Sequence, residues 1–266
     1  MKTPLLTGLI RSLTRTLKEW AEQNPALYER LKAWSAFLLA RITLGALCSA
    51  LAMYLFAKIA HEVMEDETRA FDFAALLFLK EHRSPLLYPL MKDVSWLAGG
   101  RVQPFVVALA ALGFWRAKRF MPDGLTLLLA TAGGMGLIVG LKHLFHRPRP
   151  DVIFTSLGYS FPSGHSFFAL VVYGLLAVLL TKSSPLRTRI AAMSLAAAAI
   201  LLVGFSRMYV GEHFPSDVAA GYAVGFPWLW VCSTFVPRWR SRRSVSNPTQ
   251  SDVPEIPKKP SGHEPL

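Results

Sequence analysis

Apolar stretches separated by short polar connections are the most regular feature of this sequence. A helix needs about 20 apolar residues to cross the hydrocarbon core of a bilayer. Six stretches approach or exceed that length, and they cover residues 36–60, 94–115, 125–141, 166–180, 190–210 and 218–236. The second stretch is interrupted by Gly99, Gly100 and Arg101. The pattern predicts an all-α fold, a bundle of six transmembrane helices.

Both ends of the chain differ from this apolar middle, and three regions are expected. Residues 1–35 carry apolar residues at helical spacing, namely Leu6, Ile10, Leu13, Leu17 and Trp20. This spacing predicts a cytoplasmic amphipathic helix, either on the membrane surface or packed on the inner end of the bundle. Residues 36–237 form the membrane domain. Residues 238–266 are basic and rich in proline, which predicts a disordered cytoplasmic tail.

The amino-acid composition agrees with a membrane protein. Hydrophobic residues make up 52% of the 266 positions and charged residues only 17%, against about 25% charged residues in soluble domains. These values exclude a disordered chain, and two cysteines are too few for a secreted fold held by disulfides. Cys48 and Cys232 lie inside predicted spans, where buried free thiols are expected.

The net charge of +12 would suit a nucleic-acid-binding protein, but the positions of the basic residues favour another interpretation. They gather before the first span, after the second, between the fourth and fifth, and after the sixth, which is one side of a six-span bundle. Lys and Arg favour the cytoplasmic side of a membrane. The charge therefore predicts a multi-pass protein of the inner cell membrane with both termini in the cytoplasm. No nucleic-acid partner is expected.

Two connections on the opposite, outer side carry unusual polar residues at the ends of the predicted spans. Lys142, Arg149 and Arg207 bring three cations together with few carboxylates to neutralise them. A phosphate would satisfy these cations, and the fork of an arginine matches two phosphate oxygens. Ser163 and Gly164 precede the fourth span, where free backbone N–H groups at the start of a helix favour an anion.

Two histidines and an aspartate supply reactive groups next to this expected anion site. His213 and Asp217 are four positions apart, so the carboxylate can accept the Nδ1 proton and leave Nε2 free as a nucleophile or base. His165 stands in the first turn of the fourth span. These groups and a cationic cradle suffice for phosphoryl transfer. A two-metal site needs several clustered carboxylates, so we expect no metal and no other cofactor.

The same residues occur in a recognisable order. Lys142 is followed by Arg149-Pro150, then by Pro162-Ser163-Gly164-His165, and last by Ser206-Arg207 with His213 and Asp217. In order and spacing they resemble the three-part signature of the type-2 phosphatidic acid phosphatase superfamily, membrane lipid phosphatases that share their active site with vanadium haloperoxidases. The resemblance implies a six-helix bundle, active at its outer end, that generally needs no metal.

The resemblance also implies a role for each residue. His213 would attack phosphorus and form a phosphohistidine, Asp217 would hold its tautomer, and His165 would protonate the leaving oxygen. The phosphate oxygens would be bound by Lys142, Arg149, Ser163, Gly164 and Arg207. The substrate would be a phosphomonoester or diphosphate of a lipid in the bilayer, such as undecaprenyl diphosphate, phosphatidylglycerol phosphate or phosphatidate. The oligomeric state does not follow from the sequence.

Several alternatives stay open beside this interpretation. A lipid phosphotransferase would use the same phosphohistidine, and a six-span anion transporter would use the same cations. A haloperoxidase is disfavoured because the chain is a membrane protein. Arg147 precedes Pro148 but lies too near Lys142 to match the signature, so it is interpreted as an interfacial anchor. The second Pro-Ser-Gly-His sequence, at residues 260–263, is attributed to chance, and residues 71–79 either cover the site as an interfacial helix or pack within the bundle.

Overall fold

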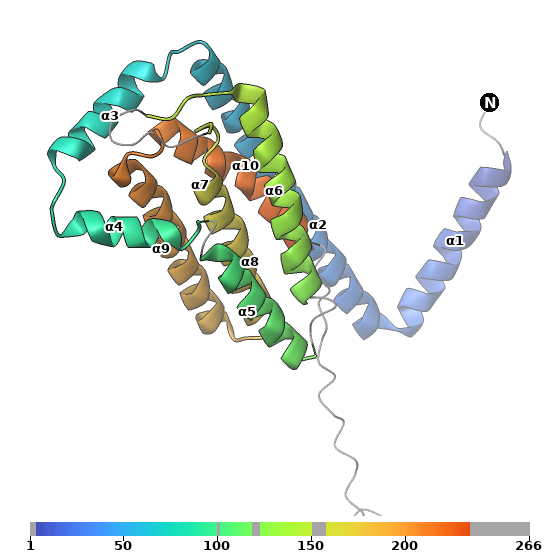
Figure 1. Ribbon diagram of the computed structural model, residues 1–266. Helices are drawn as coiled ribbons and strands as arrows, with labels where there is room; N and C mark the ends of the chain where they lie inside the picture. The colour runs from blue at the N-terminus through green and yellow to red at the C-terminus, as the bar shows by residue number, and fades with distance from the viewer. Residues whose placement is uncertain (1–3, 100–101, 119–122, 151–157, 235–266) are drawn as a thin grey trace, which may run out of the picture.

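The computed structural model describes residues 4–99, 102–118, 123–150 and 158–234, and every regular element among them is a helix (Figure 1). This confirms the all-α prediction. The helices are α1 (Pro4–Gln23), α2 (Pro25–Met64), α3 (Arg69–Glu81), α4 (Leu87–Trp96), α5 (Gln103–Arg116), α6 (Leu125–Phe145), α7 (Gly164–Phe168), the π-helical turn η2 (Ala169–Tyr173), α8 (Gly174–Thr181), α9 (Leu186–Val210) and α10 (Pro215–Thr234). The predicted tail, residues 238–266, lies outside the described residues.

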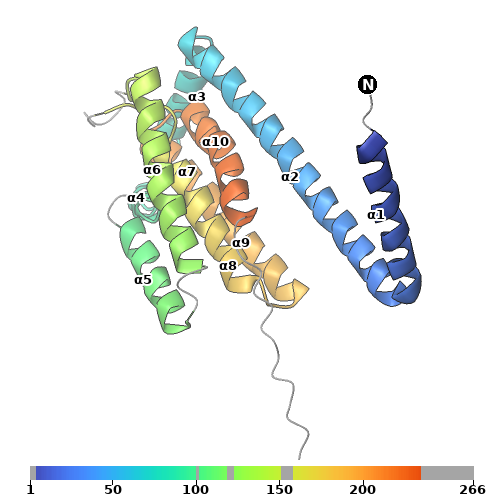
Figure 2. The same ribbon diagram turned by 90° about the vertical axis from the view of Figure 1, so that its right-hand side faces the viewer.

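Four of these helical stretches are long and apolar enough to cross a membrane. They are α2, α6, α9 and the continuous rod that α7, η2 and α8 form over Gly164–Thr181. Two further helices, α5 and α10, run beside them in Figures 1 and 2. With 14 residues, α5 is shorter than a full span, and α10 carries Pro227 in its interior. Four of the predicted spans are therefore supported, and the total of six stays a prediction.

The second predicted span, residues 94–115, is wrong as a continuous helix. The structure divides it into α4, which ends at Trp96, and α5, which begins at Gln103. Pro104 lies at the start of α5, where its missing N–H costs no hydrogen bond. The separate α4 lies crosswise at the side of the bundle (Figure 1) and packs mainly against α9.

The rod of α7, η2 and α8 forms the centre of the bundle. Phe167, Val171, Leu175 and Leu179 recur every four residues along it and are fully buried. The helices around it instead expose large apolar side chains, including Leu195 on α9 at 73% and Phe105 on α5 at 71%. Exposure of this kind is unfavourable in water, whereas lipid tails cover it. The surface is therefore that of a membrane protein.

The short apolar segment 71–79 lies within α3, on the same side of the bundle as α4 (Figure 1). We call α3 and α4 together the outer cap, where outer is a label for the end of the bundle at which α3 lies. Asp72 on α3 is completely buried, while Phe71 and Phe78 on the same helix are 68% and 59% exposed. Because α3 directs its carboxylate inward and its phenyl rings outward, it packs on the bundle and exposes an apolar face on its other side.

The close approach of α10 to the start of α7 yields a test of the packing. A Cβ atom on Gly221 would lie 2.5 Å from the Ser163 carbonyl oxygen, whereas one on Gly136 of α6 has nothing within 4 Å. Overpacking costs about 1–3 kcal/mol, and replacing a helical glycine with alanine otherwise gains up to about 1 kcal/mol. We expect Gly221→Ala to lower the melting temperature in detergent and Gly136→Ala to maintain or raise it. Equal melting temperatures would contradict the contact.

Candidate active site

The residues singled out in the sequence come together where α6 and α9 end and where α7 and α10 begin (Figure 1). Lys142 lies in the last turn of α6, Arg149 follows that helix, and Arg207 lies in the last turn of α9. Ser163 is the N-cap residue of α7, ahead of Gly164 and His165. His213 lies in the turn between α9 and α10, and Asp217 lies in the first turn of α10.

The turn that carries His213 has a simple origin in the sequence. Gly211 ends α9 with a φ of 87°, a left-handed conformation that favours glycine. Pro215 then begins α10, where proline fits the first helical turn. The short connection leaves His213 and Phe214 between the two helix ends, and both side chains are buried.

Asp217 holds the imidazole of His213 and also caps the turn. The Nδ1 atom of His213 lies 3.3 Å from Oδ2 of Asp217, and the same oxygen accepts the backbone N–H of Phe214 at 3.0 Å. The side chains of His213 and Asp217 are 1% and 0% exposed. The carboxylate therefore has the position required to fix one tautomer of the ring. The ring of His165 lies nearby, with its centroid 6.4 Å from that of His213.

Ser163 joins the start of α7 to α10. Its backbone N–H donates to the carbonyl oxygen of Asp217 at 2.9 Å, and its hydroxyl oxygen accepts the N–H of Ser166 at 3.4 Å. This cap holds Gly164 and His165 beside the first turn of α10. A Cβ atom on Gly164 would make only an ordinary contact, at 3.4 Å from Ile138, so the backbone of α7 is accessible at this point.

The three predicted cations surround this centre, and we call them the cationic cluster (Lys142, Arg149 and Arg207). Lys142 donates through Nζ to the carbonyl oxygens of Tyr159 and Ser160, at 2.6 and 3.3 Å. Glu212 pairs with both arginines, at 3.5 Å from Arg149 and in direct contact with Arg207. Arg207 also donates to the hydroxyl of Ser95 on α4, so the outer cap touches the cluster.

Both arginines retain unused hydrogen-bond donors. The Nε atoms of Arg149 and Arg207 are buried and have no hydrogen-bond partner within the described residues. Within the same ranges, no group of three or more His, Cys, Asp or Glu side chains is arranged to hold a metal ion. The groups that converge here are N–H donors of cations, and such donors suit an anion with several oxygens.

The charge of the cluster acts directly on His213. Burial of the ring, followed by the positive charges of Arg207 and Arg149, holds the pKa of His213 well below its usual value of 6.5. Lys142 acts in the same direction, and a hydrogen bond with the Ser160 backbone opposes the shift. The imidazole is therefore neutral at physiological pH, and a neutral imidazole has a nitrogen lone pair available.

The structure corrects the interpretation of Arg147 as an interfacial anchor. Its side chain is only 12% exposed and pairs with Asp217 at 2.7 Å and with Asp72 at 2.8 Å. Sequence reasoning also assigned no site role to Asp72 and Glu212. One signal was available for Asp72, because a carboxylate between Phe71 and Phe73 in an apolar segment needs a buried partner.

Other histidines of the outer connection lie at the edge of the site. His143 and His146 are exposed and pack against the ring of Tyr159, with centroids 5.6 and 4.6 Å apart. The copy of the Pro-Ser-Gly-His sequence that contains His263 lies outside the described residues.

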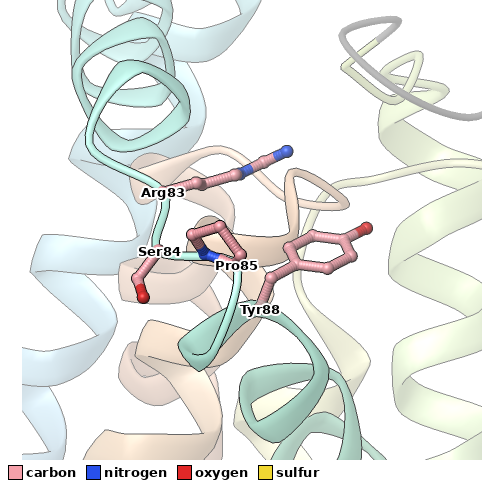
Figure 3. Close-up of a pocket in the computed structure, with 4 residues that line it drawn as sticks. All are labelled: Arg83, Ser84, Pro85 and Tyr88. Atoms are coloured by element: carbon pink, nitrogen blue, oxygen red, sulfur yellow. The ribbon is translucent and has the colours of Figure 1, made fainter.

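A separate hollow of about 450 Å³ lies at the turn between α3 and α4 (Figure 3). Arg83, Ser84, Pro85 and Tyr88 line it. The Ser84 N–H donates to the hydroxyl of Tyr209 on α9 at 2.8 Å, and the guanidinium of Arg83 lies 5.3 Å from the centroid of the Tyr88 ring. The hydrogen bond to Tyr209 fastens the outer cap to α9, and the contact between Arg83 and Tyr88 lies within the cap.

The known proteins with similar sequences include two that are named as phosphatases. The PAP2 superfamily model matches residues 123–241. Phosphatidylglycerophosphatase B of Bacillus subtilis is 32% identical over 188 residues, which cover 69% of this chain and 90% of that protein. Lipid phosphate phosphatase delta of Arabidopsis thaliana is 26% identical over 163 residues, which cover 54% of this chain and 39% of that protein.

A solved structure shows the same fold. The crystal structure of a transmembrane PAP2-type phosphatidylglycerolphosphate phosphatase from Bacillus subtilis matches with a TM-score of 0.67 at 28% identity, over 72% of this chain and 98% of that chain. The fold and the site thus define a membrane phosphatase built entirely from helices in its described part. The chain belongs to the PAP2 superfamily, as the resemblance to type-2 phosphatidic acid phosphatases predicted.

Removing a cation of the cluster should raise the pKa of His213. Lys142→Met takes away a positive charge that disfavours the imidazolium, while the control Lys58→Met removes an exposed lysine from α2. The imidazole nitrogens can be followed by NMR of isotope-labelled histidine in detergent. We expect His213 to stay neutral at about pH 6 in wild type and Lys58→Met, and to protonate at higher pH in Lys142→Met than in wild type. A wild-type ring that titrates at its usual pKa would contradict the arrangement.

Proposed function

We propose that this protein hydrolyses a phosphomonoester or diphosphate of a membrane lipid through a phosphohistidine formed on His213, without a metal ion. The observation that carries the proposal is a buried imidazole, held by Asp217 beside three cations, two of which, Arg149 and Arg207, retain unused donors. A nucleophile oriented by a carboxylate and a binding site for the attacked group are the two requirements for covalent phosphoryl transfer.

In the first step, Nε2 of His213 attacks phosphorus while the bond between phosphorus and the lipid oxygen breaks. Asp217 keeps the proton on Nδ1 and stabilises the positive charge that develops on the ring. His165 gives a proton to the leaving oxygen, and the negative charge of the bound phosphate favours the protonated form of His165. General acid catalysis of this kind raises the reaction rate about 10²- to 10⁴-fold.

In the second step, His165 accepts a proton from water, and the water oxygen attacks the phosphohistidine. The N–P bond breaks, inorganic phosphate leaves, and His213 returns to its neutral form. Throughout both steps the cationic cluster, the Ser163 hydroxyl and the Gly164 N–H hold the phosphate oxygens. They stabilise the charge on these oxygens in the transition state. The phosphate competes with Glu212 for Arg149 and Arg207.

Lipids with exposed phosphate groups are the proposed substrates. The Bacillus subtilis relative is named for phosphatidylglycerophosphate, so phosphatidylglycerol phosphate is the first substrate to test, with undecaprenyl diphosphate and phosphatidate next. We place the site on the outer face of the inner cell membrane with both termini in the cytoplasm. This orientation is supported by the basic residues at the opposite end of the bundle, which include Arg116 and Lys182.

Phosphate release from phosphatidylglycerol phosphate by purified protein, with a chelator present, tests the proposal. We expect the wild type to release phosphate, and His213→Ala to lower the rate at least about 10³-fold because the nucleophile is lost. His82→Ala is the matched control, since His82 is an exposed histidine on the outer cap. Acid-labile, base-stable label on wild-type protein from a radioactive substrate would identify the phosphohistidine.

Each of four other outcomes would contradict part of the proposal. Equal release by wild type and His213→Ala would exclude His213 as the nucleophile. Loss of activity with chelator, restored by a divalent metal, would exclude the metal-independent reaction. Consumption of the lipid without release of inorganic phosphate would favour the phosphotransferase. If no lipid phosphate is consumed and anion flux in liposomes persists in His213→Ala, the transporter would be favoured.

A further inference from the structure

A buried polar network lies behind the reactive pair, on the side of the outer cap, and the proposed mechanism uses Asp217 but none of its other members. Its members are Asp72, Arg147, Ser216 and Asp217. Asp72 and Asp217 are fully buried, and the Arg147 side chain is 12% exposed. Charges buried to this degree are stable only as part of a complete set of partners.

Arg147 connects the two carboxylates of the network. One end of its guanidinium donates to Oδ1 of Asp217 and to the hydroxyl of Ser216, both at 2.7 Å. The other end donates to Oδ2 of Asp72 at 2.8 Å and to the hydroxyl of Thr68 at 3.3 Å. Its central carbon lies 4.4 Å from the centroid of the Phe214 ring, next to His213. The planar fork of an arginine is suited to such a double contact.

Asp72 fixes the first turn of α10 from the other side. Its Oδ1 atom accepts the backbone N–H of Ser216 at 3.1 Å, and its Oδ2 atom accepts the Ser216 hydroxyl at 2.5 Å. A carboxylate on the free N–H groups at the start of a helix stabilises that turn. Asp217 is the next residue in the same turn, so Asp72 sets the position of the backbone that carries it.

The two oxygens of Asp217 face different partners. Oδ1 accepts from Arg147 at 2.7 Å and from the hydroxyl of Ser160 at 3.5 Å, while Oδ2 faces Nδ1 of His213 and accepts the N–H of Phe214. Rotation of this carboxylate would break contacts on both sides. Arg147 therefore determines which oxygen is presented to His213 and at what angle, although it makes no described contact with the imidazole itself.

We propose that Arg147 and Asp72 are positioning residues for the His213–Asp217 pair, and that α3 thereby forms part of the catalytic unit. The proposal rests on the proposed function for its kinetic meaning, since a fixed carboxylate orients the nucleophile. Loss of a group that orients a metal ligand typically lowers activity about 10- to 100-fold, and we expect a loss of the same order for a group that orients Asp217. Because Arg147 is occupied by two carboxylates, it is not assigned to the phosphate.

Two conservative variants test the proposal against a purely structural role. Arg147→Lys keeps the charge but replaces the fork by a single ammonium, and Asp72→Asn keeps the shape but places an amide where Arg147 needs an acceptor. The matched controls are Arg69→Lys and Asp66→Asn, which change an exposed ion pair at the start of α3. We expect both network variants to lower kcat about 10- to 100-fold, and both controls to leave it unchanged.

The substrate KM and the inhibition constant of inorganic phosphate separate positioning from folding. Both should stay at wild-type values in Arg147→Lys and Asp72→Asn, because the cationic cluster is intact. An unchanged kcat in both variants would overturn the proposal. A joint fall of kcat, phosphate binding and melting temperature would also overturn it, since the network would then only hold the fold.

A spectroscopic measurement keeps this test independent of the proposed activity. The Nδ1–H proton of His213, held by Asp217, should give a downfield NMR signal in the wild type. Arg147→Lys and Asp72→Asn should shift or broaden that signal, whereas Arg69→Lys and Asp66→Asn should not. If the wild type releases phosphate from no lipid, the proposed function fails, and the signal still decides whether the network positions the pair. An identical signal in all variants would refute the positioning role.

Discussion

Burying an ionised side chain at the end of an apolar bundle costs several kcal/mol unless a group of opposite charge or a set of donors lies against it. In this protein Asp217 is a fully buried carboxylate and needs such partners. Its two oxygens are shared among Arg147, His213 and the N–H of Phe214. The same carboxylate therefore ends the turn after α9, starts α10 and orients the imidazole, and the local fold and the reactive pair depend on one group.

The opposite side of His213 shows the complementary situation, an excess of positive charge. Glu212 is the one carboxylate in the described residues that pairs with the cationic cluster, and it is shared by Arg149 and Arg207. An excess of cations attracts a phosphate and also disfavours protonation of a neighbouring imidazole. In the proposed mechanism, affinity for the substrate and availability of the nucleophile thus come from the same arrangement of charges.

Sequence reasoning anticipated these groups to different extents. The spacing of His213 and Asp217 and the positions of the cations at span ends follow from helical geometry, and the structure brings them together as expected. The pairing of Arg147 with Asp72 could not be anticipated in the same way, because the two residues are 75 positions apart and meet only through packing of the outer cap. The break between Trp96 and Gln103 had a signal in the sequence, because Gly99, Gly100 and Arg101 interrupt the apolar stretch, but the apolar residues on both sides still gave the pattern of one long span.

The length of α2 has a mechanical consequence. Its 40 residues make a rod about 60 Å long, against about 30 Å for the hydrocarbon core. Gly45 packs against Trp230, near the inner end of α10, so the residues before Gly45 continue beyond that helix (Figure 2). Asn24 alone separates α1 from α2, and backbone hydrogen bonds from Asn24 to Trp20 and from Tyr28 to Asn24 continue across the joint. The position of α1 is therefore set by the far end of α2, because no loop lies between the two helices.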